Sequence, residues 1–116
     1  MLKKYPELVE KTLTKESKHT PLMRAVYNGD EKMADLILEH NANVNAANKK
    51  GATALITAVK RNHFEIVKKL VIERKAEIDV QDRNSLSPLD YAILSGFYES
   101  AYFLHERSKE KTMKSA

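Results

Sequence analysis

Helical stripes of apolar residues follow one another along the centre of the chain, each separated from the next by a polar stretch. One stripe holds Met33, Leu36 and Ile37, and an equivalent stripe holds Ile66, Val67 and Leu70. Spacings of three and four residues place side chains on one face of a helix. A shorter helix of about two to three turns fits in front of each stripe. The pattern therefore predicts successive pairs of antiparallel helices.

The same phrase opens each predicted helix pair. Residues 20–29 recur as residues 53–62 and again as residues 87–96, so the period is 33 and then 34 residues. A fixed period in this range is typical of units that bury their apolar faces against their neighbours. We expect one domain of stacked units at 20–106, divided at about 20–52, 53–86 and 87–106, with a lead-in at 1–19 and a basic tail at 107–116.

Residues with special backbone roles mark the ends of the first helices. Thr20 and Ser87 are good N-cap residues, and each is followed by a proline, which suits the first helical position. Gly29, Asn62 and Gly96 lie where each helix has to end in a left-handed residue, which glycine and asparagine tolerate best. Between units, residues 41–51 and 75–85 predict extended fingers with a turn at the tip.

The repeated phrase resembles the ankyrin repeat family. Thr20-Pro21-Leu22, Ala25 and Gly29 match the first half of the family pattern, and Ala42-Asn43-Val44-Asn45-Ala46 matches its end. The resemblance covers residues 20–106. It implies an all-α ankyrin-repeat solenoid of stacked helix-turn-helix units joined by β-hairpin-like fingers. It also implies a non-catalytic protein-protein interaction module that binds a partner protein on its concave face.

The chain departs from the family pattern at several positions. Asn41, Lys75 and Ser85 replace glycines at helix ends and at a finger tip, and one extra residue lengthens the second unit before its finger. Asp90 replaces a family histidine and is placed to form a capping box with Ser87.

The two ends of the array predict closing elements. Ser100 and His105 occupy positions that hold Ile66 and Val71 in the second unit, so the last helix is expected to cap the stack with a polar surface. Residues 6–13 have a helix-forming composition with three apolar positions. We expect a leading helix there that covers the first unit.

Composition excludes several classes of function. The chain contains no cysteine, hence no disulfide and no thiol nucleophile, and no long apolar stretch predicts a signal peptide or a membrane span. The four histidines have unrelated positions in the repeat, and the three glycines form no phosphate-binding loop. We expect no catalytic, cofactor-binding or metal site. An intracellular, cytoplasmic protein is the expectation, with a secreted effector as the alternative.

The net charge of +4 is confined to the ends of the chain. Residues 20–105 contain 11 basic and 11 acidic residues, whereas both terminal segments are basic. Basic tails leave electrostatic association with nucleic acid or an anionic membrane open as an alternative function, although no RNA-binding signature accompanies them. A structural subunit or inhibitor within a larger complex is a further alternative.

The resemblance places the candidate partner-binding residues on the finger tips and first helices. They are Arg24, Tyr27, Asn48, Lys49, Lys60, Arg61, Tyr91 and Leu94. Aromatic residues and arginine dominate binding hot spots, but packing between units is the alternative role of the two tyrosines. Lys68 and Lys69 belong to a second helix and are expected on the opposite side.

Two further features concern the surface of the array. Tyr98 and Tyr102 leave weak self-association of an otherwise monomeric chain open. Asn45 looks like the residue that is hydroxylated in some ankyrin repeats, and its alternative role is to bind finger backbone.

Overall fold

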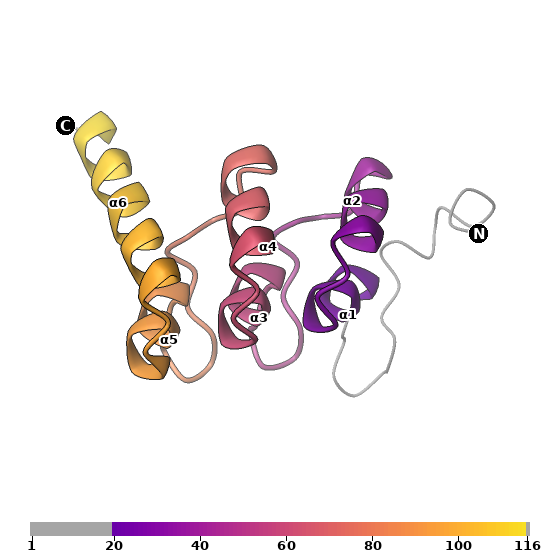
Figure 1. Ribbon diagram of the computed structural model, residues 1–116, viewed down its shortest axis with the longest axis horizontal. Coiled ribbons are helices and arrows are strands. Elements are labelled where there is room, and N and C mark those ends of the chain that lie inside the picture. The colour runs from indigo at the N-terminus through magenta and orange to yellow at the C-terminus, as the bar shows by residue number, and fades with distance from the viewer. Residues whose placement is uncertain (1–19, 116) are drawn as a thin grey trace.

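Three helix pairs stand side by side in chain order (Figure 1). The computed structural model describes residues 20–115, and side chains for residues 20–110. The pairs are α1 (Pro21–Tyr27) with α2 (Glu31–Glu39), α3 (Ala54–Lys60) with α4 (Phe64–Lys68) and the π-helix η2 (Lys69–Glu73), and α5 (Pro88–Ser95) with α6 (Tyr98–Ser115). The first helices form one row and the second helices the other. The predicted all-α solenoid is confirmed, while the predicted leading helix lies outside the described residues.

Each first helix begins at a capped residue. The Thr20 hydroxyl accepts a hydrogen bond from Met23 N at 3.2 Å, and Thr53 accepts one from Ile56 N at 3.3 Å. Ser87 and Asp90 form the complete capping box, since Ser87 N also donates to the Asp90 carboxylate at 2.9 Å. These bonds satisfy N–H groups that have no partner within the helix.

The first helices end in left-handed residues, as predicted. The φ angles are +72° at Gly29, +58° at Asn62 and +74° at Gly96. The chain reverses within three residues at each of these points. The second helix of each unit therefore packs antiparallel to the first.

The core is a row of contacts between units and between the two helices of each unit. Ala25, Ala58 and Ala92 are buried at one repeat position, which lets adjacent first helices approach closely. Leu55 and Val67 in the middle unit are fully buried. Since every unit contacts only its neighbours, stability depends on these joints.

The extra residue of the second unit is absorbed by the π-helix. Arg74 N donates to Lys69 O at 3.2 Å, a bond that spans five residues instead of four, and Ala76 N donates to Leu70 O at 2.9 Å. A π-turn accommodates one additional residue without breaking the helix. Lys75 follows in the left-handed conformation, with φ +54°, as Asn41 does at +66° in the first unit.

Polar side chains build the two finger tips. The Asn48 carboxamide oxygen accepts hydrogen bonds from Lys50 N at 2.9 Å and from Ala52 N at 3.0 Å. The Asp82 carboxylate does the same for Asn84 N and Leu86 N at 2.9 and 3.2 Å. Two backbone hydrogen bonds close each turn, and no strand is assigned in the described part of the chain. The predicted tip turns are thus present without extended β-pairing.

The fingers are joined to each other as well as to the helices. Arg83 N donates to Lys50 O at 2.9 Å between the tips. Nearer the stems, Glu77 N donates to the Asn45 carboxamide oxygen, also at 2.9 Å. Asn45 therefore binds finger backbone, which is the alternative role considered for it above.

The last helix differs from expectation at one position. Ser100 was expected on the capping surface but is fully buried, and its hydroxyl has no hydrogen-bond partner among the described residues. Its equivalents are the exposed Met33 and the buried Ile66, so this position faces the preceding unit rather than the open end. Ser100 therefore packs against the second unit. His105 is exposed, as expected.

Helix α6 is twice as long as α2 and continues through residues 107–115, which were expected as a tail. Between residues 20 and 115, no helix combines the length and apolar character needed to cross a membrane. The division of the chain into lead-in, repeat domain and tail remains a prediction.

Candidate partner-binding groove

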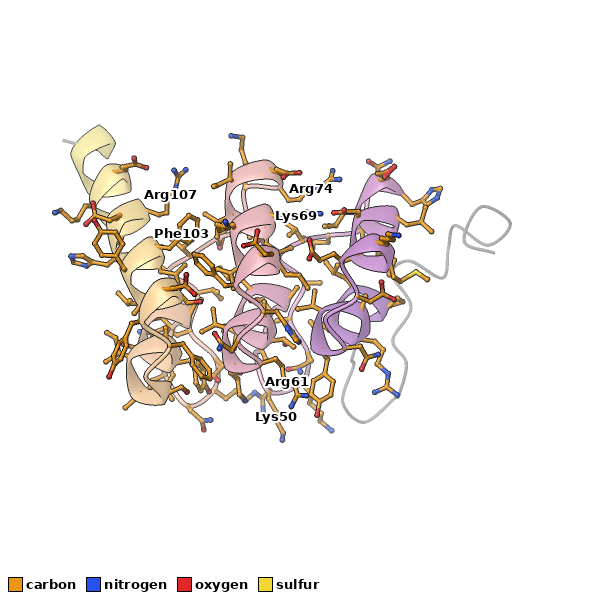
Figure 2. The ribbon with its side chains drawn as sticks, in the orientation of Figure 1. Lys50, Arg61, Lys69, Arg74, Phe103 and Arg107 are labelled. Carbon is orange, nitrogen blue, oxygen red and sulfur yellow. The ribbon has the colours of Figure 1, made fainter. Side chains whose placement is uncertain are left out.

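A hollow of about 280 Å³ lies between the tips of the two fingers and the C-terminal ends of α1 and α3. We call it the concave groove. Its lining residues are Tyr27, Asn48, Lys50, Ala52, Thr57, Lys60, Arg61, Asp82 and Asn84. In Figure 2, Lys50 and Arg61 lie together at the first-helix side of the molecule, whereas Lys69 and Arg74 lie at the opposite side. The groove therefore collects residues from both fingers and both helices.

Two cations of the groove lie over aromatic rings of a neighbouring unit. The Arg61 guanidinium carbon is 4.3 Å from the centroid of the Tyr27 ring, and Lys60 Nζ is 5.1 Å from the centroid of the Tyr91 ring. Such contacts attract the cation to the negative face of the ring. They hold Lys60 and Arg61 near fixed positions while leaving both side chains exposed.

Asp82 is held by a network at the tip of the second finger. The Tyr91 hydroxyl donates to its carboxylate, in addition to the two backbone N–H groups of the finger turn. Partial burial raises the pKa of Asp82, but the bonds from Tyr91, Leu86 and Asn84 and the charge of Lys60 outweigh it, so the pKa is lowered overall. Ionised Asp82 thus stabilises the fold, and this contribution is lost as the pH falls through its folded pKa.

Tyr91 is held by the same network. Burial and the bond to Asp82 raise the pKa of its phenol. Its ring is half-buried and packs on the core. Its hydroxyl is engaged by Asp82, so Tyr91 supports the groove rather than lining it.

The structure brings together four of the eight predicted residues. Tyr27, Asn48, Lys60 and Arg61 line the groove, and Tyr91 borders it. Arg24, Lys49 and Leu94 are exposed but do not line it.

Five lining residues were not among the candidates: Lys50, Ala52, Thr57, Asp82 and Asn84. Asp82 could have been found by aligning the two fingers, because it occupies the position of Asn48. Both side chains use an oxygen to cap their finger turn, so each shapes the groove wall.

Lys68 and Lys69, the two basic residues expected on the opposite side, lie outside the groove. Lys68 pairs with Glu65 at 3.3 Å, and its Nζ is 5.0 Å from the Phe64 ring centroid. Lys69 pairs with Asp35 at 2.8 Å and with Glu31 at 3.2 Å, and these bonds raise its pKa. The geometry agrees with the expectation that Lys68 and Lys69 lie apart from Lys60 and Arg61.

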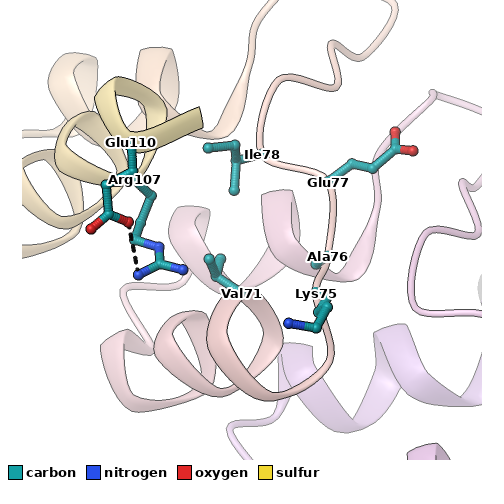
Figure 3. A pocket seen from close by; sticks show the side chains of 7 residues that line it. All are labelled: Val71, Lys75, Ala76, Glu77, Ile78, Arg107 and Glu110. Carbon is teal, nitrogen blue, oxygen red and sulfur yellow. Dashed lines mark ion pairs between the residues drawn. The ribbon is translucent and has the colours of Figure 1, made fainter. Parts of the chain in front are cut away.

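Another hollow, of about 310 Å³, lies between the end of η2, the stem of the second finger and α6 (Figure 3). Its charged lining residues balance in number, with Lys75 and Arg107 against Glu77 and Glu110, and Arg107 pairs with Glu110 at 3.1 Å. None of the predicted binding residues lines it. Across residues 20–115, no three metal-binding side chains gather in one place.

Comparisons with known proteins agree with the repeat architecture. The family model described as ankyrin repeats (3 copies) matches residues 2–82 and also residues 22–115. Mouse Rabankyrin-5 is 35% identical over 74 residues, which are 64% of this chain and 6% of that protein. The ankyrin repeat and KH domain-containing protein mask-1 of Caenorhabditis elegans is 30% identical over 95 residues, or 82% of this chain and 4% of the relative. The chain thus spans a small fraction of either relative.

A solved structure has the same fold. It is the crystal structure of the yeast ribosomal protein Rps3 in complex with its chaperone Yar1, and the match has a TM-score of 0.82 and 29% identity. The match covers 89% of this chain and 75% of the other. With the family model matching most of the sequence and the helix pairs stacked as described, the chain belongs to the ankyrin repeat family, whose repeats are protein-protein interaction modules.

Proposed function

We propose that this chain is a non-catalytic module that binds a partner protein in the concave groove, and that the partner contributes an acidic segment. The observation that carries the proposal is the convergence of Lys50, Lys60 and Arg61 on a groove whose other charged lining residue is Asp82. Complementary charge steers encounter and suppresses wrong partners. The acidic partner segment would lie between the finger tips and the first helices.

The geometry of the groove supports the proposal in a second way. Arg61 and Tyr27 stack on each other at 4.3 Å, and both are residue types that dominate binding hot spots. Because Tyr27 holds the guanidinium in place before binding, less side-chain entropy is lost when a carboxylate binds to it. Arginine can also bind a carboxylate through two parallel hydrogen bonds.

The solved relative supports the class of function. The complex of Yar1 with Rps3 pairs a chaperone with a ribosomal protein, in a structure that resembles this one over most of its length. A short ankyrin array of this kind is thus large enough to hold a protein partner.

The charges of α6 favour the groove over the last helix as the binding surface. Arg107 pairs with Glu110 at 3.1 Å and Lys109 with Glu106 at 3.8 Å, so the described cations beyond residue 106 are balanced on their own helix. Phosphate-driven binding needs cations that can release counterions. This part of the chain supplies few of them.

The test uses two pairs of charge reversals with the same change in net charge. Partners are first captured with the intact chain and identified by mass spectrometry, and affinity is then measured by calorimetry. Lys60→Glu with Arg61→Glu is expected to weaken binding by about tenfold or more. Lys68→Glu with Lys109→Glu is the control and is expected to leave affinity within about twofold at physiological salt. Circular dichroism checks that both variants keep their helix content.

Equal affinity of the two double variants would exclude the groove as the binding surface. A loss of binding in the control alone would place the partner on the second helices instead.

A further inference from the structure

The open end of the third unit exposes apolar residues at positions that are covered in the first two units. Val26 and Val59 occupy one position of the first helix, and both are fully buried because the next unit packs on them. Their equivalent in the third unit is Ile93, which is 59% exposed. Ile93 therefore belongs to an inter-unit contact surface that no described unit covers.

Two tyrosines of α6 occupy positions that also face the next unit. In the first unit these positions hold Glu31 and Asp35, which bind Lys69 of the second unit. In the second unit the first of them holds Phe64, which contacts Phe103 of the third unit. In the third unit they hold Tyr98 and Tyr102, which are 80% and 70% exposed.

Leu94, on α5, also occupies a repeat position whose residue contacts the next unit in the first two units. Tyr27 contacts Arg61 of the next unit, and Lys60, at the same repeat position, contacts Tyr91 of the next unit. The equivalent residue in the third unit is Leu94, which is 72% exposed. Ile93, Leu94, Tyr98 and Tyr102 thus form one surface, which we call the outer face.

We propose that the outer face binds the outer face of a second copy of this chain, giving a two-fold symmetric dimer. The four side chains carry no charge, so placing the face against itself brings no like charges together among them. In a two-fold interface the same patch covers itself, and both apolar surfaces are removed from water at once. Tyrosine pairs can also adopt the edge-to-face contact that Phe64 and Phe103 make within the chain.

The exposed area predicts a weak, reversible dimer. Side chains of this size that are exposed by 59–80% offer on the order of 500 Å² per copy. Stable interfaces bury about 800 Å² per partner, and about 1,000 Å² in total is the lower range for a specific contact. The dimer is therefore expected to form at micromolar to millimolar concentration.

Sedimentation velocity across that concentration range tests the proposal. The intact chain is expected to shift from 13.2 kDa toward twice that mass as concentration rises. The variant Leu94→Lys with Tyr102→Lys is expected to remain monomeric. These lysines copy Lys60 and Lys68 at the equivalent positions of the second unit, so the helices tolerate them.

Two further variants keep the test specific. Tyr98→Glu copies Glu31 of the first unit and is also expected to abolish the dimer. Ile72→Lys changes an apolar side chain that is 49% exposed on η2 and is expected to dimerise like the intact chain. A chain that stays monomeric at every concentration would overturn the proposal. So would a dimer that survives the double lysine variant, or one that Ile72→Lys disrupts equally.

Dimer formation through the outer face is expected to be independent of partner binding in the concave groove. Lys60→Glu with Arg61→Glu is expected to retain the dimer while losing the partner. A monomeric chain would leave the proposed groove function unaffected.

Discussion

The two joints between units use equivalent positions but different chemistry. Between the first and second units, Lys69 reaches Glu31 and Asp35 at 3.2 and 2.8 Å. Between the second and third units, Phe103 occupies the position of Lys69 and meets the Phe64 ring edge-on, with centroids 5.9 Å apart and planes at 86°. One joint is closed by ion pairs at the surface, and the other by an aromatic pair that packs on the core.

Repeat position and residue chemistry play separate roles at these two joints. The repeat determines where each unit contacts the next. The residues at those positions determine whether the contact responds to salt, because exposed charges are screened and apolar contacts are not. The same freedom allows the outer face to be apolar, and its four side chains are 59–80% exposed in the described part of the chain.

The largest expected effect comes from removing the aromatic joint. Phe103→Ala should lower the free energy of unfolding by about 2–3 kcal/mol, somewhat below the cost of emptying a fully buried phenylalanine site. The ring is partly buried against the core, so a cavity and a lost ring contact both contribute. Urea unfolding followed by circular dichroism measures the change, and a loss below about 0.5 kcal/mol would contradict an aromatic joint.

An intermediate loss of stability is expected when alanine replaces either of two glycines that share one backbone conformation. Gly29 and Gly96 have φ of +72° and +74°, so alanine at either position should cost about 1 kcal/mol in backbone strain. A Cβ at Gly29 would also lie 2.8 Å from His63 Cε1, whereas at Gly96 the nearest atom is Tyr98 Oη at 3.9 Å. The His63 ring is held near the Tyr27 carbonyl, so Gly29→Ala should be the more destabilising.

Thermal unfolding of the two alanine variants side by side makes this comparison. Equal melting temperatures would mean that His63 moves aside without cost and does not tighten the first joint.

The smallest expected effect is at the ionic joint. Lys69→Met removes both ion pairs, but the side chains are partly exposed, and exposed pairs contribute little. The variant should be slightly less stable than the intact chain in dilute buffer, and the difference should disappear at high salt. Urea unfolding at low and high sodium chloride measures it. A loss that persists in salt would show that Lys69 acts through packing of its stem instead.

Much of the fold follows from the repeated phrase. The threonine and serine caps, the left-handed residues after each first helix and the small residues between helices are all local features, and each is present where predicted. The sequence also located the extra residue of the second unit, but it did not show how the backbone accommodates that residue. A π-turn and a looped-out residue satisfy the same sequence, and the packing of Leu70 and Val71 against the core favours the π-turn.

Ser100 and Leu94 lie in surroundings that the repeat period does not encode. Aligning Ser100 with Met33 and Ile66 identifies one repeat position, but which neighbour that position faces depends on how the helices are rotated in the stack. Leu94 was chosen for the groove because it aligns with Tyr27 and Lys60. Those residues border a groove because a further unit follows them, and no described unit follows Leu94.

The concave groove is proposed to select an acidic segment. Titration of the ¹⁵N-labelled chain with a glutamate-rich peptide tests it most directly, by mapping amide chemical-shift changes. We expect the largest changes at Tyr27, Lys50, Lys60 and Arg61, and we expect these changes to disappear when Lys60 and Arg61 are both replaced by glutamate. Changes centred on Lys68, Lys69 and Arg74 at the opposite side of the molecule would contradict it.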